Sequence, residues 1–136
     1  MNLTIFTDGG ARGNPGPAGI GAVIKDASGK NLAELKEYIG ETTNNVAEYR
    51  ALILALKKAL ELGGENLQIN MDSELIVRQM LGQYKIKEPT LKLLAQEVFK
   101  LTNKFKNVGF THVVRELNKQ ADKLVNRAID EALGIT

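Results

Sequence analysis

The chain has 136 residues, of which 43% are hydrophobic and 25% are charged, and its formal net charge is +2 at pH 7. This length and composition predict a single globular domain over residues 1–136 that buries a core. There is no cysteine and one histidine, which excludes disulfides, thiolate or multi-histidine metal sites and a cysteine nucleophile.

The start of the chain and the length of its apolar runs indicate the compartment in which we expect the protein. Residues 1–4 lead directly into a strand pattern, without the basic and apolar regions of a signal peptide. No apolar run approaches the roughly 20 residues that span a bilayer. Together with the absence of cysteine, this leads us to expect a cytoplasmic monomer with no membrane contact and no implied protein partner. The small net charge means that any surface for a polyanion must be local.

The first part of the chain predicts three strands, at residues 2–7, 18–25 and 31–39. A loop rich in glycine and proline, residues 9–19, joins the first two strands, and a turn at residues 26–29 joins the second to the third. Such short connections are typical of an antiparallel meander.

Helices and strands alternate in the rest of the chain. After a polar cluster in which Asn45 is a candidate N-cap, a helical period begins at Val46 and stops at Gly63. Ser73 and Asn118 are candidate caps of the second and last helices. The remaining predicted elements are a strand at 67–71, helices at 74–81 and 89–105, a strand at 108–114 and a helix from 119 to 133. The predicted fold is α/β, with element order β-β-β-α-β-α-α-β-α and a mixed five-stranded sheet flanked by helices.

Two aspartates end predicted strands. Asp8 follows the first strand and Asp72 follows the fourth, which we expect to be parallel neighbours because a helix connects the meander to the fourth strand. In open α/β sheets, ligands bind beyond the carboxyl ends of the strands. Either aspartate alone is also typical of a turn.

Two further acids lie early in predicted helices. Stepping by three and four residues from Glu48 reaches Ala51, Leu52 and Ala55, so Glu48 lies on the stripe that should face the sheet. An acid on a buried line is costly unless it is paired or binds a metal, although a capping box is the alternative for Glu48. Asp122 lies at the edge of the apolar stripe of the last helix, where a solvated helix acid is the alternative.

Together, these four acids can reach one cleft at the edge of the sheet. Such a cluster repels itself unless cations neutralise it, and carboxylate oxygens favour Mg²⁺, Mn²⁺ or Ca²⁺. Two divalent ions roughly 4 Å apart form a site for phosphodiester hydrolysis that needs neither histidine nor cysteine.

Four segments in order carry a family resemblance: FTDGGARGNPGPAGIGAVI, TTNNVAEYRALILAL, MDSELIVRQM and RELNKQADKLVNRA. With them the chain closely resembles type 1 ribonuclease H, in a short form without a separate hybrid-binding domain, over essentially its whole length. The resemblance implies a ribonuclease H-like fold with sheet order 3-2-1-4-5 and a single catalytic domain. It also implies an endonuclease that cuts the RNA strand of RNA·DNA hybrids, leaves 3′-hydroxyl and 5′-phosphate ends and has low sequence specificity. Two Mg²⁺ ions, with Mn²⁺ as a substitute, are the implied cofactors.

The resemblance also assigns residues. It implies that the metal-binding and catalytic carboxylates are Asp8, Glu48, Asp72 and Asp122. Glu48 is also implied to lie near the RNA 2′-hydroxyl, Thr43 to hold a DNA phosphate, and three asparagines to read the minor groove. The full set of expected substrate-binding residues is Gly9, Gly10, Arg12, Asn14, Thr43, Asn44, Asn45 and Ser73.

The chain departs from many family members in two places. The loop before the last helix is reduced to residues 115–118, so we expect Arg115 to take the catalytic place of a loop histidine, while His112 is structural. A protruding basic helix is missing between the second and third helices, where Tyr84, Lys85 and Lys87 are partial substitutes.

Three other functions stay open at this point. The shortened loop is compatible with broader specificity that includes double-stranded RNA. A non-catalytic hybrid-binding module should lack one or more acids, whereas all four are present. A P-loop protein is disfavoured because no Gly-Lys-Ser/Thr follows the glycine-rich stretch.

Overall fold

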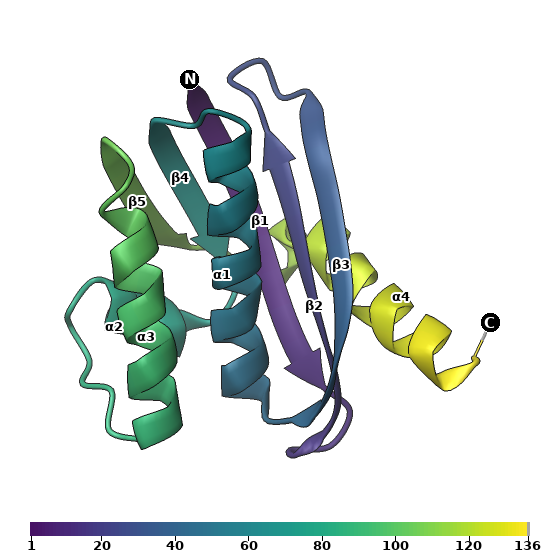
Figure 1. The fold of residues 1–136 in the computed structure, drawn as a ribbon. Coiled ribbons are helices and arrows are strands. Elements are labelled where there is room, and N and C mark those ends of the chain that lie inside the picture. The colour runs from purple at the N-terminus through teal and green to yellow at the C-terminus, as the bar shows by residue number, and fades with distance from the viewer. Residues whose placement is uncertain (136) are drawn as a thin grey trace.

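The computed structural model describes residues 1–135 and confirms the predicted order of elements (Figure 1). The strands are β1 (Asn2–Ala11), β2 (Gly16–Lys25), β3 (Asn31–Thr42), β4 (Asn66–Met71) and β5 (Asn107–His112). The helices are α1 (Asn44–Glu61), α2 (Glu74–Met80), α3 (Pro89–Thr102) and α4 (Lys119–Leu133), with a short 3-10 turn at Arg115–Leu117. No helix within residues 1–135 combines the length and apolarity that crossing a bilayer requires.

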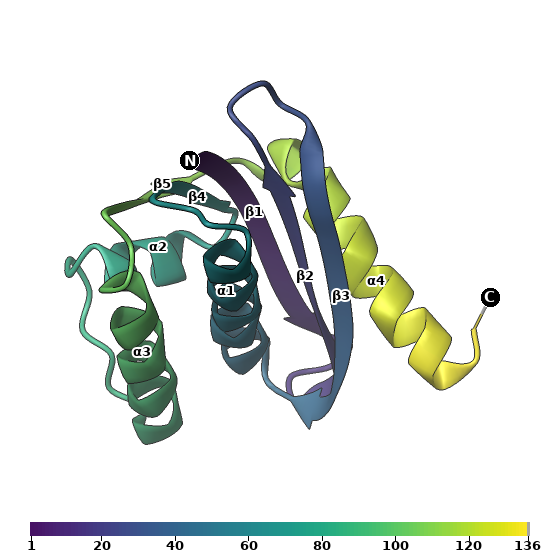
Figure 2. The ribbon, with the colours of Figure 1, turned by 45° about the horizontal axis from the view of Figure 1, so that its top comes forward.

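The sheet has the expected order β3-β2-β1-β4-β5 over the described residues. β1 pairs with β2, and β2 with β3, in antiparallel fashion, whereas β1 with β4 and β4 with β5 are parallel pairs. Figure 2 shows α1, α2 and α3 on one face of the sheet and α4 on the other. The main core lies between the sheet and α1 with α3, where Leu52, Leu56 and Ile69 are fully buried.

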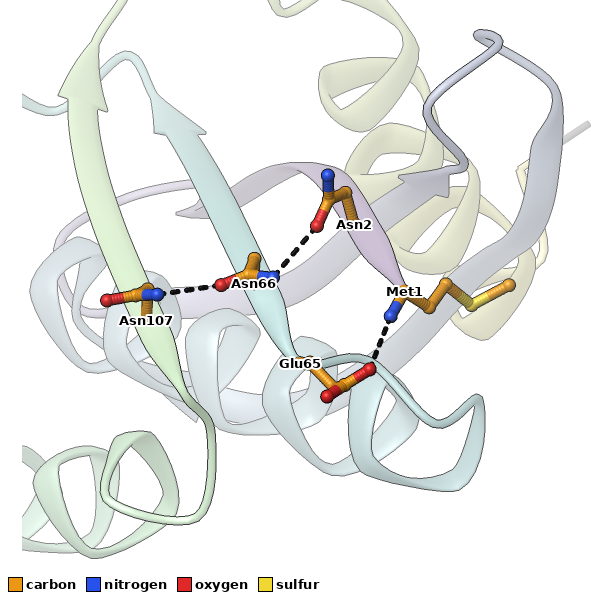
Figure 3. A network of polar contacts seen from close by, with 5 residues as sticks. All are labelled: Met1, Asn2, Glu65, Asn66 and Asn107. Atoms are coloured by element: carbon orange, nitrogen blue, oxygen red, sulfur yellow. Dashed lines mark hydrogen bonds and ion pairs between the residues drawn. The ribbon is translucent and has the colours of Figure 1, made fainter.

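Three asparagines fix the register of the parallel strands at the end of the sheet where each begins (Figure 3). Asn66 is paired with both Asn2 and Asn107 in the strand register. Its Nδ2 donates to Asn2 Oδ1 at 2.9 Å, and its Oδ1 accepts from Asn107 Nδ2 at 2.7 Å. The same register pairs Thr7 with Met71 at the far end, so the residues that follow them emerge side by side.

The structure corrects several predicted boundaries. β1 does not end at residue 7, because after β4 ends at Met71 it continues to pair with β2 as far as Ala11 opposite Ala18. The expected loop at 9–19 is therefore a hairpin whose link is residues 12–15. Asn45 is not the N-cap of α1; Thr43 is, and its Oγ1 accepts from the Val46 N–H at 3.3 Å. α3 and β5 also end earlier than predicted, at Thr102 and His112.

Glycines of β2 let α4 lie directly on the strand backbone. A Cβ added to Gly21 would lie 2.7 Å from the Ala121 carbonyl oxygen and 2.9 Å from Leu124 Cβ. At Gly19 the added Cβ would lie 2.8 Å from the Val125 carbonyl oxygen. The missing side chains thus set the distance between the sheet and the helix that carries Asp122.

We expect Gly21→Ala to lower the free energy of unfolding by about 1–3 kcal/mol, because the added methyl group must push α4 away from β2. Urea denaturation measures this difference. Gly10→Ala is the matched control, since its added Cβ would meet its nearest neighbour at an ordinary 3.9 Å. If both variants lost the same free energy of unfolding, this account of the packing between β2 and α4 would be contradicted.

Candidate active site

A cleft of about 400 Å³ opens at the edge of the sheet beyond the end of β4. It collects most of the side chains that the sequence singled out. The predicted site residues that line it are Asp8, Gly9, Gly10, Arg12, Asn44, Asn45, Glu48, Asp72, Ser73, Arg115 and Asp122. Asn14 and Thr43 are not part of this lining, although both contact α1. The predicted convergence of four acids on one cleft is therefore confirmed.

Each acid reaches the cleft from a different element. Asp8 lies in β1 one residue past the last pair with β4, and Asp72 follows the last residue of β4. Glu48 comes from α1 and is buried, as its place on the apolar stripe predicts. Asp122 comes from the first turn of α4 and is half-buried. The parallel pairing of β1 with β4 is what brings the first two together.

Three of the carboxylates form a tight group. Oxygen atoms of Asp8, Glu48 and Asp72 all lie within 4.8 Å of one another. The backbone N–H of Gly9 donates to Glu48 Oε1 at 2.6 Å and to Asp8 Oδ1 at 3.0 Å. A Cβ on Gly9 would lie 2.4 Å from the Ala47 carbonyl group, so any side chain there would push α1 away. Gly9 therefore holds Glu48 in place through close packing and one shared donor.

Burial and mutual repulsion shift the acidity of this group. Burial, together with the charges of Asp72 and Asp122, raises the pKa of Asp8 to about 8. Burial, with the charge of Asp8, raises the pKa of Glu48 well above its ordinary value. Burial also raises the pKa of Asp72, against the opposing effects of the Arg115 charge and a hydrogen bond from Asn118. The group is thus short of positive charge.

A divalent cation fits this donor set. The three carboxylates offer hard oxygen ligands that can converge on one point, as Mg²⁺ and Mn²⁺ prefer. Asp122 lies outside the group of three but is close enough to hydrogen-bond Asp8. The described residues therefore provide three carboxylates that could hold a divalent cation, with a fourth acid beside them.

The expected substrate-binding amides are partly occupied by the protein itself. Asn14 Oδ1 accepts from the Asn44 backbone N–H at 3.0 Å, and Asn44 Oδ1 accepts from the Ala11 N–H at 2.8 Å. Both amide oxygens are used, which leaves the two NH₂ groups as donors for a ligand. Thr43 and Ser73 serve as N-caps of α1 and α2, so their hydroxyls have structural duties.

Sequence reasoning missed two asparagines of this region. Asn118 was expected to cap α4, but its side chain makes no capping hydrogen bond. Its Nδ2 instead donates to the Thr7 carbonyl oxygen at 2.9 Å, and the residue is 1% exposed beside Asp72. Asn126 lines the cleft, and its Nδ2 donates to the Asp122 carbonyl oxygen at 3.1 Å. An asparagine directly before a helix predicts an N-cap, so the sequence gives no sign of the contact between Asn118 and Thr7. Nothing in the sequence indicates that Asn126 lines the cleft.

Arg12 lines the cleft, as expected, and also contacts α4. Its Nη1 lies 2.6 Å from Asp130 Oδ1, and its Nη2 donates to Asn126 Oδ1 at 3.2 Å. The guanidinium that was expected to bind substrate is thus engaged by α4.

Known proteins match nearly the whole chain. The profile of a family described as reverse transcriptase-like matches residues 6–128. LC11-RNase H1, solved in complex with an RNA/DNA hybrid, is 54% identical, with a TM-score of 0.93 over 96% of this chain and 99% of that chain. RNase H1 of Halobacterium salinarum is 37% identical, with a TM-score of 0.94 over 96% of this chain and 99% of that chain. A bifunctional protein of Mycobacterium tuberculosis is 47% identical over 97% of this chain, which spans 36% of that protein's length.

The raised pKa of Asp8 gives a pH-dependent stability. In metal-free protein, the folded state holds a proton on Asp8 up to about pH 8, whereas the unfolded state releases it near 3.8. Folding therefore binds a proton between these values, and stability falls as pH rises through them. We expect Asp8→Asn to be more stable than the wild type at pH 8.5 in EDTA, by on the order of 2 kcal/mol, and this advantage to shrink towards pH 4. Urea denaturation at several pH values measures it.

Asp26→Asn is the control for this measurement. The pKa of Asp26 is lowered by hydrogen bonds from Ser28 and Lys30, so its contribution to stability is lost as pH falls, the opposite direction. A difference between Asp8→Asn and wild type that stays constant with pH would contradict the account.

Proposed function

Because the chain belongs to the type 1 ribonuclease H family, we propose that it is an endonuclease that hydrolyses the RNA strand of RNA·DNA hybrids. The products are 3′-hydroxyl and 5′-phosphate ends, and sequence specificity is low. The observation that carries this proposal is the group of Asp8, Glu48 and Asp72, whose oxygens lie within 4.8 Å of one another at the ends of two parallel strands. The likeness to a ribonuclease solved with an RNA/DNA hybrid supports the same substrate here.

The proposed cofactor is a pair of Mg²⁺ ions, for which Mn²⁺ can substitute. Asp8, Glu48, Asp72 and Asp122 would hold them, and their hard oxygen donors support this choice. Bound ions of this kind supply charge stabilisation at the phosphate and activation of the attacking water. The fold contributes the fixed placement of the acids, since Gly9 donates to Glu48 and the buried Asn118 beside Asp72 is held by the Thr7 carbonyl oxygen.

The cleft also suits a nucleic-acid strand with 2′-hydroxyls. The NH₂ groups of Asn14 and Asn44 can donate to a 2′-hydroxyl or to base edges in the minor groove, and Asn45 lies beside them. A Cβ on Gly10 would reach no atom closer than 3.9 Å, so the wall there is open backbone that a strand can approach. Thr43 and Ser73 are proposed to contact phosphate or sugar in addition to capping their helices.

Arg115 is the proposed catalytic cation. It is exposed, lines the cleft and acts electrostatically on Asp72. A permanent guanidinium charge in this place can bind phosphate in the position that a loop histidine occupies in many family members.

The setting of this activity is also proposed. Residues 1–136 are proposed to act as one catalytic domain and as a monomer. The proposed compartment is the cytoplasm, which the cysteine-free composition supports.

Cleavage of a labelled RNA·DNA hybrid tests the function. We expect cutting in Mg²⁺ or Mn²⁺, and a loss of more than roughly 100-fold in kcat for Asp8→Asn and Asp72→Asn, because each removes a metal-binding charge. Asp26→Asn makes the same chemical change in an exposed turn outside the cleft and should keep wild-type activity. No cutting in either metal, or full activity of the two cleft variants, refutes the mechanism.

The same assay decides between the remaining alternatives. A labelled RNA duplex placed beside the hybrid reports whether specificity extends to double-stranded RNA. Binding of the hybrid without cleavage in both metals would identify a non-catalytic hybrid-binding module.

Arg115 gives a separate prediction. We expect Arg115→Ala to lower kcat by roughly 100-fold, the lower end of the loss that is usual when one charge-stabilising donor is removed, and Arg115→Lys to recover part of this loss. Steady-state kinetics on the hybrid measure both variants. Arg127→Ala, an exposed arginine of α4 that does not line the cleft, is the control. An Arg115→Ala enzyme as fast as this control would exclude the catalytic role.

A further inference from the structure

Arg12 lies on the short link between β1 and β2 but makes its side-chain contacts with the second half of α4. Its Nη1 forms an ion pair with Asp130 Oδ1 at 2.6 Å, and its Nη2 donates to the Asn126 side-chain and backbone oxygens at 3.2 and 3.4 Å. Both charged side chains keep a little over a third of their surface exposed. The guanidinium is therefore paired while it remains at the rim of the cleft.

The other side of the link is fastened to α1. Asn14 accepts a hydrogen bond from the first backbone N–H of that helix, at Asn44. The link thus joins the helix that carries Glu48 to the helix that carries Asp122. The cleft lies between these parts, so their separation sets the space that a nucleic-acid strand must enter.

A continuous path of contacts leads from Arg12 to the acid group. Asn126 receives the guanidinium on its Oδ1, while its Nδ2 donates to the backbone carbonyl of Asp122 one turn earlier. Asp122 in turn lines the same cleft as Asp8. A shift of α4 at Asp130 and Asn126 would therefore reach both the wall of the cleft and the fourth carboxylate.

We propose that Arg12 is a positioning residue which, through Asp130 and Asn126, fixes α4 against the β1–β2 link and so sets the width of the hybrid-binding cleft. This inference rests on the proposed function. The competing interpretation is that Arg12 binds a phosphate directly. The two interpretations predict opposite effects of removing Asp130. If Arg12 binds phosphate, loss of Asp130 frees the guanidinium and should tighten hybrid binding. If Arg12 is a positioning residue, loss of Asp130 breaks the contact with α4 and should weaken hybrid binding.

The test combines Arg12→Ala, Asp130→Ala, the double alanine variant and the exchange of the two residues (Arg12→Asp with Asp130→Arg). Equilibrium binding of a fluorescent RNA·DNA hybrid in EDTA gives Kd, and cleavage in Mg²⁺ gives KM and kcat. We expect each single variant to raise Kd and KM about two- to fivefold, with a smaller change in kcat. The double alanine variant should be no worse than either single one, and the exchange should recover most of the loss.

A second ion pair on α4 is the matched control. Lys36 of β3 pairs with Glu131, next to Asp130 in the chain but outside the cleft. Breaking this pair with Glu131→Ala should cost comparable stability in urea and leave Kd for the hybrid unchanged. A merely structural role for Arg12 would instead make the two pairs indistinguishable in hybrid binding.

Several outcomes overturn the proposal. They are an Asp130→Ala variant that binds hybrid as well as wild type or better, additive effects of the two alanine substitutions, or an exchange variant that recovers nothing. If the wild-type chain neither binds nor cleaves hybrid, the proposed function is refuted. The positioning contact still stands in that case if urea denaturation of the same four variants shows that the stability effects of positions 12 and 130 are coupled. Absence of that coupling refutes the positioning contact whatever the activity.

Discussion

The burial of carboxylates that also repel one another is the constraint on which the rest of the structure depends. Asp8, Glu48 and Asp72 would separate if they were free, yet their oxygens lie within 4.8 Å of one another. The parallel pairing of β1 with β4 brings Asp8 and Asp72 together. The hydrogen bond between Asn66 and Asn2 joins the same two strands at their other end. In the metal-free protein, protonation relieves the cost of burying these charges, as the raised pKa of Asp8 shows. A divalent cation would take the place of the proton, which would couple metal affinity to stability.

Glycine, more than any polar residue, makes this arrangement possible. Gly9 lets α1 approach β1 and supplies the N–H that holds Glu48. Gly19 and Gly21 let α4 approach β2 in the same way on the other face of the sheet. The acids from α1 and α4 can reach Asp8 and Asp72 because both helices lie directly on strand backbone. The sequence GGARGNPGPAGIG is therefore as much a packing surface as a loop.

The element order and the four acids could be predicted because they depend on local patterns. Helical periodicity places Glu48 on a buried line, and the end of β4 places Asp72. Asp8 lies inside β1, directly past the last pair with β4, so it still meets Asp72 although the predicted end of β1 is wrong. What failed depended on distant partners. The extension of β1 to Ala11 requires β2 to continue alongside. Asn118 is the N-cap residue of α4, as predicted, but its side chain donates to the carbonyl oxygen of Thr7, a partner far away in sequence, instead of capping the helix. The pairing of Arg12 with Asp130 is likewise invisible to spacing and charge counts.

The orientation of the amides supports the low sequence specificity that we propose. With their oxygens bound to backbone N–H groups, Asn14 and Asn44 present donors alone towards a ligand. In a minor groove every base pair offers acceptor atoms, so fixed donors meet a partner whatever the sequence. A 2′-hydroxyl accepts equally well, and this group distinguishes the RNA strand. Under the proposed function, the hydrogen bonds that hold the β1–β2 link would therefore also favour contacts to backbone and groove over base identity.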